Sequence, residues 1–179
     1  MLNNDFVEKK VSSKSAIVIY DSRFGNTKKL GESLELGLKE AGVRTDCFNS
    51  LDVNVPSLNQ YDLICVGAPT EGFTASKPIK EFLEKLDSDN LSGKSFFAFD
   101  TKVSPGIFGS AAKYIEKELK KLELRAIAPH ESAIVSTTRD RGVINGATLK
   151  EGEGKKFEEL GKEIGNSLAL TTMGKAIQV

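Results

Sequence analysis

Residues 16–30 read AIVIYDSRFGNTKKL, and this stretch is the most informative part of the chain. Its first five residues, 16–20, form an apolar run that ends abruptly at Asp21. A polar turn containing glycine follows at 22–27, and a helical pattern then begins, with leucines one turn apart at Leu30, Leu34 and Leu38. A strand, a tight turn and a helix start in this order present unpaired backbone N–H groups and the positive end of a helix to one point in space. This arrangement suits a phosphate group.

Composition and charge limit the class of protein. The 179 residues fit one domain with a hydrophobic core, and 39% hydrophobic and 28% charged residues are ordinary values for a soluble globular protein. Lys plus Arg and Asp plus Glu each total 25, so the charge gives no reason to expect a nucleic-acid or membrane partner. Cys47 and Cys65 lie in apolar segments, which indicates buried thiols in a reducing compartment rather than a disulfide or a metal site. Because the chain has no apolar window long enough to span a membrane and no apolar leader, we expect a cytoplasmic protein.

Strand and helix patterns alternate along the chain. We expect strands near 16–20, 43–48, 63–67, 95–99 and 125–136, and helices over 26–41, from Pro78, over 109–124 and over 152–170. Residues 137–149 are polar and are expected to be irregular. The central strands are apolar throughout, which is typical of a parallel sheet covered by helices on both faces. These patterns predict an α/β fold with a doubly wound five-stranded parallel sheet in a domain at 15–170, between a polar N-terminal lead-in at 1–14 and a C-terminal tail at 171–179.

Three loops have the composition of a binding site. In sheets of this kind, ligands bind beyond the carboxyl ends of the strands, where the strand order reverses. Loops 21–27, 68–77 and 100–108 leave the first, third and fourth strands. In a sheet with the order 2-1-3-4-5 these strands are neighbours, so we expect the three loops to meet at one crevice.

The same loops resemble those of the flavodoxin family. Tyr20–Thr27 is similar to the family's FMN phosphate loop, written S/T-x-x-G-x-T, and Val66–Phe73 resembles its second flavin loop, G-x-P-T followed by glycine. Residues 100–108, with the helix start that follows, are similar to the third loop. The resemblance covers about residues 15–170. It implies the flavodoxin-like fold, one noncovalently bound FMN and one- or two-electron redox chemistry.

The resemblance also assigns residues to the cofactor. The expected binding residues are Ser22, Arg23, Phe24, Gly25, Asn26 and Thr27 for the phosphate, and Pro69, Thr70, Glu71, Gly72, Phe73, Asp100, Thr101, Lys102 and Phe108 around the ring. Phe73 and Phe108 are candidates to flank the flavin, since an aromatic contact contributes roughly 0.5–1.5 kcal/mol beyond burial. Gly72 would let the preceding peptide turn a carbonyl toward the flavin N5, because glycine tolerates either peptide orientation.

Two departures from the family pattern keep other functions open. Phe24 stands where the family often has Thr or Ser, and loop 100–108 lacks the Tyr that commonly stacks on the outer flavin face. An open flavin face suits hydride transfer, so the alternative to an electron carrier between cytoplasmic redox partners is an NAD(P)H-dependent quinone or flavin reductase. A further alternative is a scaffold or sensor that has lost FMN, in which Gly25, Asn26 and Thr27 form only a turn and a helix cap. The sequence leaves the oligomeric state open.

Overall fold

The structure, a computed structural model, describes residues 14–103 and 109–173. Within these residues the strands are β1 (Ser15–Tyr20), β2 (Arg44–Asn49), β3 (Leu63–Glu71), β4 (Thr74–Ala75), β5 (Ser95–Lys102), β6 (Arg125–Ala126), β7 (Glu131–Asp140) and β8 (Val143–Leu149). The helices are α1 (Asn26–Glu40), α2 (Lys77–Leu83), α3 (Ser88–Leu91), α4 (Ala111–Lys121) and α5 (Glu153–Met173), with a 3-10 segment η1 (Val55–Gln60). The expected lead-in, apart from Lys14, and residues 174–179 of the expected tail lie outside the described residues.

The main sheet has the strand order β2-β1-β3-β5-β7-β8. The strands from β2 to β7 in this order pair in parallel, for example Ile17 with Ile64 and Cys65 with Phe97. This is the order 2-1-3-4-5 of the expected doubly wound sheet, which is therefore confirmed. β8 extends the sheet as an antiparallel strand next to β7.

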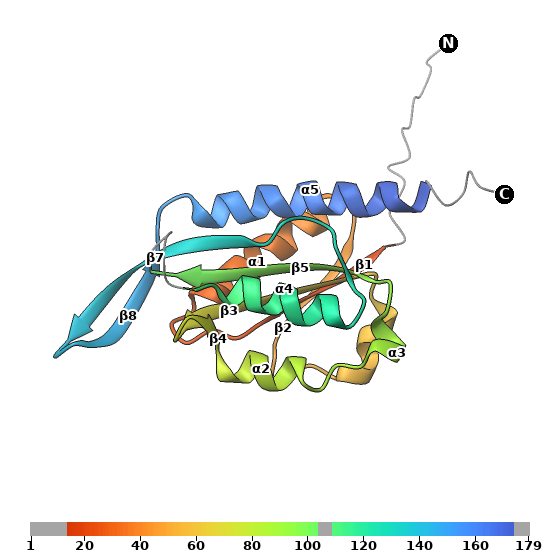
Figure 1. The fold of residues 1–179 in the computed structure, drawn as a ribbon. Helices are drawn as coiled ribbons and strands as arrows, with labels where there is room; N and C mark the ends of the chain where they lie inside the picture. The colour runs from red at the N-terminus through yellow and green to blue at the C-terminus, as the bar shows by residue number, and fades with distance from the viewer. Residues whose placement is uncertain (1–13, 104–108, 174–179) are drawn as a thin grey trace, which may run out of the picture.

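Helices cover both faces of the sheet (Figure 1). α1 and α5 pack on one face, and α2 and α4 pack on the other. Alternate residues of β1 therefore enter two different cores, Val18 with the α1–α5 side and Ile17 with the α2–α4 side. Because successive side chains of a strand point to opposite faces, a strand buried on both sides must be apolar throughout. This requirement explains the uninterrupted apolar run at 16–20.

The expectation that residues 137–149 are irregular is wrong. β7 continues to Asp140, and β8 returns antiparallel to it from Val143. Arg141 and Gly142 join them with φ of 47° and 83°, the positive values that a two-residue type I′ turn needs. The hairpin projects beyond the sheet (Figure 1), so much of its surface is exposed and many of its side chains are polar.

The loops after β3 and β5 are shorter than the sequence predicts. β3 continues to Glu71 and turns back into β4, which pairs Thr70 with Ala75. β5 continues to Lys102, and its partner at that position is Ile134 of β7. Extended backbone therefore carries several of the expected loop residues into the site.

In the described parts of the chain, every helix is too short or too polar to cross a membrane.

Candidate functional site

The carboxyl ends of β1, β3 and β5 meet at one cleft, as the strand order requires. The β7–β8 hairpin forms a further side. The lining residues are Ser22, Arg23, Phe24, Asn26, Thr27, Pro69, Thr70, Glu71, Thr101, Lys102, Val103, Val135, Thr137, Ile144 and Ala147. The structure thus brings together most of the residues expected to bind the cofactor, and it adds four hairpin residues that the sequence analysis missed.

The loop between β1 and α1 presents backbone donors to the cleft. Gly25 precedes α1 with a left-handed φ of 81°, and a Cβ built on it would have no heavy atom within 4 Å. Within the described residues, the N–H groups of 23–27 have no protein acceptor, whereas the N–H of Lys28 donates to Ser22 Oγ at 3.2 Å. Unpaired N–H groups at a helix N-terminus attract an anion. The loop therefore has the chemistry expected of a phosphate cradle, and it comes from the main chain.

The side chains of Asn26 and Thr27 make hydrogen bonds within the protein. Asn26 is 4% exposed, donates from Nδ2 to the carbonyl oxygen of Ala147 at 2.9 Å and accepts from the N–H of Leu149 at 3.1 Å. Thr27 is 1% exposed, and its hydroxyl lies 3.1 Å from the hydroxyl of Thr101. Asn26 is also among the residues expected to bind the phosphate, and in the structure its side chain holds the hairpin, with which no sequence signal connects it.

The β3–β4 turn lies at the rim of the cleft. Gly72 and Phe73 have φ of 51° and 71°, again the pattern of a two-residue type I′ turn, and the Phe73 side chain is 65% exposed. A Cβ on Gly109 would lie 2.1 Å from the Phe73 carbonyl oxygen, so the chain that leads into α4 packs directly on this turn. Neither Gly72 nor Phe73 lines the cleft. Phe108, the other candidate to flank a ring, lies outside the described residues.

Asp100 lies behind the cleft wall and is fully buried. Its Oδ2 accepts hydrogen bonds from the Thr70 hydroxyl at 3.1 Å, the Ser110 hydroxyl at 2.6 Å and the Ala112 N–H at 3.0 Å. Its Oδ1 is buried without a partner among the described residues. The carboxylate therefore joins the ends of β3 and β5 to the start of α4, and its side chain does not line the cleft.

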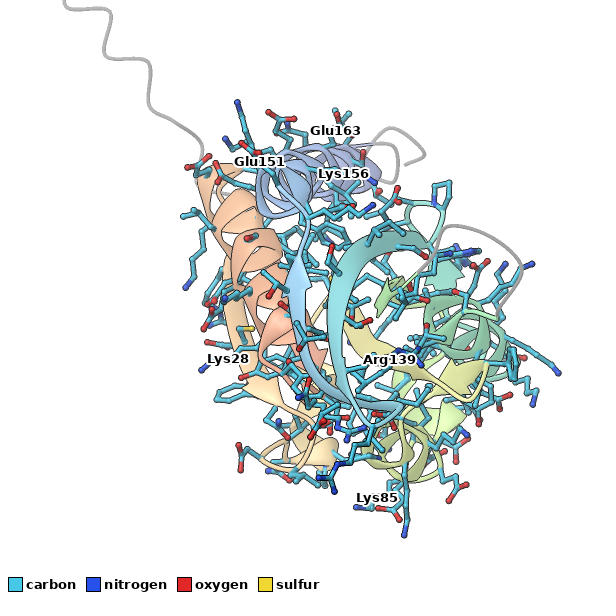
Figure 2. The ribbon with its side chains drawn as sticks, turned by 90° about the vertical axis from the view of Figure 1, so that its left-hand side faces the viewer. Lys28, Lys85, Arg139, Glu151, Lys156 and Glu163 are labelled. Atoms are coloured by element: carbon cyan, nitrogen blue, oxygen red, sulfur yellow. The ribbon has the colours of Figure 1, made fainter. Side chains whose placement is uncertain are left out.

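Charged groups surround the cleft. Arg23 and Lys102 line it together with Glu71, and the Arg23 guanidinium lies 5.1 Å from the centre of the Phe24 ring. Figure 2 shows this end of the molecule with the hairpin curving across it, Arg139 on the hairpin and Lys28 toward the side. Within the described residues, no group of three His, Cys, Asp or Glu side chains is placed to hold a metal ion.

The fold and the cleft define a doubly wound α/β protein with an anion-receptive loop before its first helix. The family model for flavodoxin matches residues 18–163, and the chain belongs to the flavodoxin family. The flavodoxin of Clostridium beijerinckii is 30% identical over 84 residues, a match that spans 46% of this chain and 60% of that protein.

Solved structures show the same fold. A flavodoxin from the domain Archaea has a TM-score of 0.71 at 22% identity, over 86% of this chain and 98% of its own. The flavodiiron protein from Giardia intestinalis has a TM-score of 0.70 at 16% identity, over 92% of this chain but only 38% of its own. The expected family and fold are thus confirmed.

Membership in the family implies a flavin cofactor, generally FMN, and a redox role. The cleft fits such a group, since the unpaired N–H groups of 23–27 suit its phosphate. Pro69, Val103 and Ile144 give apolar surface against which a planar ring can pack. The assignment of single residues to the cofactor stays a prediction.

Proposed function

We propose that this protein binds one FMN noncovalently in the cleft and transfers electrons between cytoplasmic redox partners. The observation that carries the proposal is the row of unpaired N–H groups at 23–27, held by the left-handed Gly25 at the start of α1 and opening into the cleft. Such a loop stabilises a phosphate dianion without any basic side chain. Arg23, exposed at the same loop, adds positive charge.

The remaining cleft residues would hold the ring and its chain. Pro69, Thr70 and Glu71 at the end of β3 form one side, and Thr101 and Lys102 at the end of β5 form another. Asp100 keeps the two strand ends together. The flavin itself supplies the one- or two-electron chemistry, and the protein contributes binding, orientation and exclusion of water.

A titration of the apoprotein tests the proposal. FMN should bind much more tightly than riboflavin, because only FMN carries the phosphate that the loop accepts. Gly25→Ala should weaken FMN binding, since alanine resists the left-handed φ that aims the N–H groups. Gly93→Ala is the matched control: Gly93 has a φ of 78° and open space around its Cβ position, but it lies far from the cleft lining. Equal affinities for FMN and riboflavin would contradict the cradle, and no binding of either would leave a flavodoxin fold without this cofactor role.

One observation favours a reductase as a second candidate. Among the described residues that line the cleft, Phe24 is the only aromatic one, and Val103 at the end of the β5 segment is 49% exposed. A ring without an aromatic cover on one face would be open there to a nicotinamide or a quinone. Reduction of the bound flavin by NADPH or NADH alone, without a partner protein, would support an NAD(P)H-dependent quinone or flavin reductase, and no reduction would favour the carrier.

A further inference from the structure

The β7–β8 hairpin stands beside the phosphate loop, and it lines the cleft with Val135, Thr137, Ile144 and Ala147. We propose that this hairpin is a fourth wall of the cofactor site, whose inner face covers bound FMN and limits its contact with solvent. The proposal rests on the proposed function, because it concerns how the same cleft holds its cofactor.

The register of the hairpin decides which side chains face inward. Residues directly opposite each other on antiparallel strands share one face of the sheet. Thr137 pairs with Ala147, and both line the cleft. Arg139 pairs with Ile144, so these two side chains share a face. Their pair lies nearer the tip of the hairpin than the pair of Thr137 and Ala147. Figure 2 shows Arg139 on the part of the hairpin that crosses this end of the molecule.

A β-bulge brings Ile144 to the inner face. Simple alternation from Ala147 would point Asn145 and Val143 inward and Ile144 outward. The pairing instead goes from Thr138 with Gly146 to Arg139 with Ile144, which leaves Asn145 as the extra residue. Ile144 therefore lines the cleft, while the neighbouring Val143 is 65% exposed on the other face. The bulge therefore turns the apolar side chain of Ile144 into the cleft.

The hairpin is held in place by hydrogen bonds to the phosphate loop itself. The Asn26 side chain bonds to main-chain atoms of Ala147 and Leu149, at 2.9 and 3.1 Å. At the base of the hairpin, the N–H of Ile134 donates to Glu153 Oε1 at 3.0 Å and its carbonyl oxygen accepts from the N–H of Lys150 at 3.0 Å. The spacing between cradle and wall is thus set before any ligand binds, which lowers the ordering cost of binding.

Adjacent residues on opposite faces give a matched test. Ile144→Ser should weaken FMN binding by about tenfold, because it removes apolar contact with the cofactor. It should also make the fluorescence of bound flavin easier to quench with iodide. Val143→Ser, at the exposed face of the same strand, should leave both quantities within about twofold of the parent protein. Thermal unfolding of the apoproteins shows whether either variant is folded.

A second pair of variants serves if serine disturbs the hairpin. The chain has no tryptophan, so one introduced residue is a unique reporter. In Ile144→Trp, added FMN should protect the indole from acrylamide quenching, whereas in Val143→Trp the quenching should not change. If the parent protein binds FMN and the two variants of each pair behave alike, the hairpin does not cover the cofactor, and the proposed function stands. Parent protein that binds no FMN would overturn both.

Discussion

The hydroxyl of Thr70, near the end of β3, donates to the carboxylate of Asp100 on β5 across 3.1 Å, and the same hydroxyl accepts the N–H of Ala111 at 3.0 Å. With the bonds from Ser110 and Ala112, one buried carboxylate near the end of β5 satisfies donors from the end of β3 and from the start of α4. Two sides of the cleft are therefore held by a single side chain that does not itself line it.

Removal of this carboxylate should destabilise the protein. Asp100→Ala leaves the Thr70 hydroxyl, the Ser110 hydroxyl and the Ala112 N–H without their buried acceptor, at a cost of about 2–4 kcal/mol in the free energy of unfolding. Asp100→Asn keeps one acceptor oxygen and should cost less. Urea denaturation of the apoprotein measures both.

Asp52→Ala, which changes an exposed carboxylate, is the control and should stay within about 0.5 kcal/mol of the parent protein. A more stable Asp100→Ala protein would mean that burial of the charge outweighs its three hydrogen bonds.

The contact between Gly109 and the β3–β4 turn gives a second prediction. Gly109 has a φ of 57°, and a Cβ there would lie 2.1 Å from the Phe73 carbonyl oxygen. Gly93 has a φ of 78° and no heavy atom within 4 Å of its Cβ position. Alanine at either position is strained by about 1–2 kcal/mol, but only Gly109→Ala also meets backbone. Gly109→Ala should therefore lower the free energy of unfolding at least twice as much as Gly93→Ala, and equal losses would show that the turn moves aside at no cost.

The hydrogen bonds between Asn26 and the β7–β8 hairpin give a third prediction. Asn26→Ala removes two hydrogen bonds to β8 and leaves the Ala147 carbonyl and the Leu149 N–H without partners, which should cost about 1–3 kcal/mol. Hydrogen exchange of the Leu149 amide should become faster than in the parent protein, since this amide loses its acceptor. Asn59→Ala, on the exposed side of η1, should change neither quantity. Unchanged protection of Leu149 would mean that strand pairing alone holds the hairpin.

The central sheet could be predicted from the sequence because its strands are buried on both faces. A strand such as β1 has no position where a polar side chain is tolerated, so its pattern is local and clear. The hairpin has one face toward the cleft and one toward solvent, and its polar residues conceal two strands. The pair Arg141–Gly142 was the available signal, since glycine suits the second position of a type I′ turn.

The loops that form the site could be predicted from the sequence, but the contacts between those loops and the rest of the chain could not. The glycine and the polar residues of 22–27 indicate where an anion would bind, because the chemistry is local. The partners of Asn26 lie 121 and 123 residues away, and those of Asp100 depend on how the turn after β3 meets α4. Such contacts need the register of the sheet, which no short pattern contains.

The last prediction concerns acid stability at the opposite end of the sheet. Burial alone would raise the pKa of Asp62, but the N–H of Ser15 at 2.9 Å and the Lys14 ammonium at 3.1 Å outweigh it and hold the pKa below its usual value. A lowered pKa in the folded state contributes stability that is complete above the unfolded value of about 3.9 and is lost as the pH falls through the folded value. Asp62→Asn should therefore be less stable than the parent protein by a constant amount at neutral pH, and the difference should shrink below about pH 4.

Lys14→Gln separates the two contributions to this effect. It removes the ammonium but keeps the Ser15 N–H, so the pKa of Asp62 should move back toward its ordinary value and the pH-dependent part of the stability should become smaller without vanishing. Urea denaturation at pH 7, 5, 4 and 3 measures the free energy of unfolding for all three proteins. A difference between parent and Asp62→Asn that stays constant down to pH 3 would contradict the lowered pKa, because the unfolded carboxyl takes up its proton below about pH 4 while the folded one stays ionised. A difference that grows as the pH falls would contradict the prediction, because it would require the carboxyl of Asp62 to bind its proton more readily in the folded state than in the unfolded one.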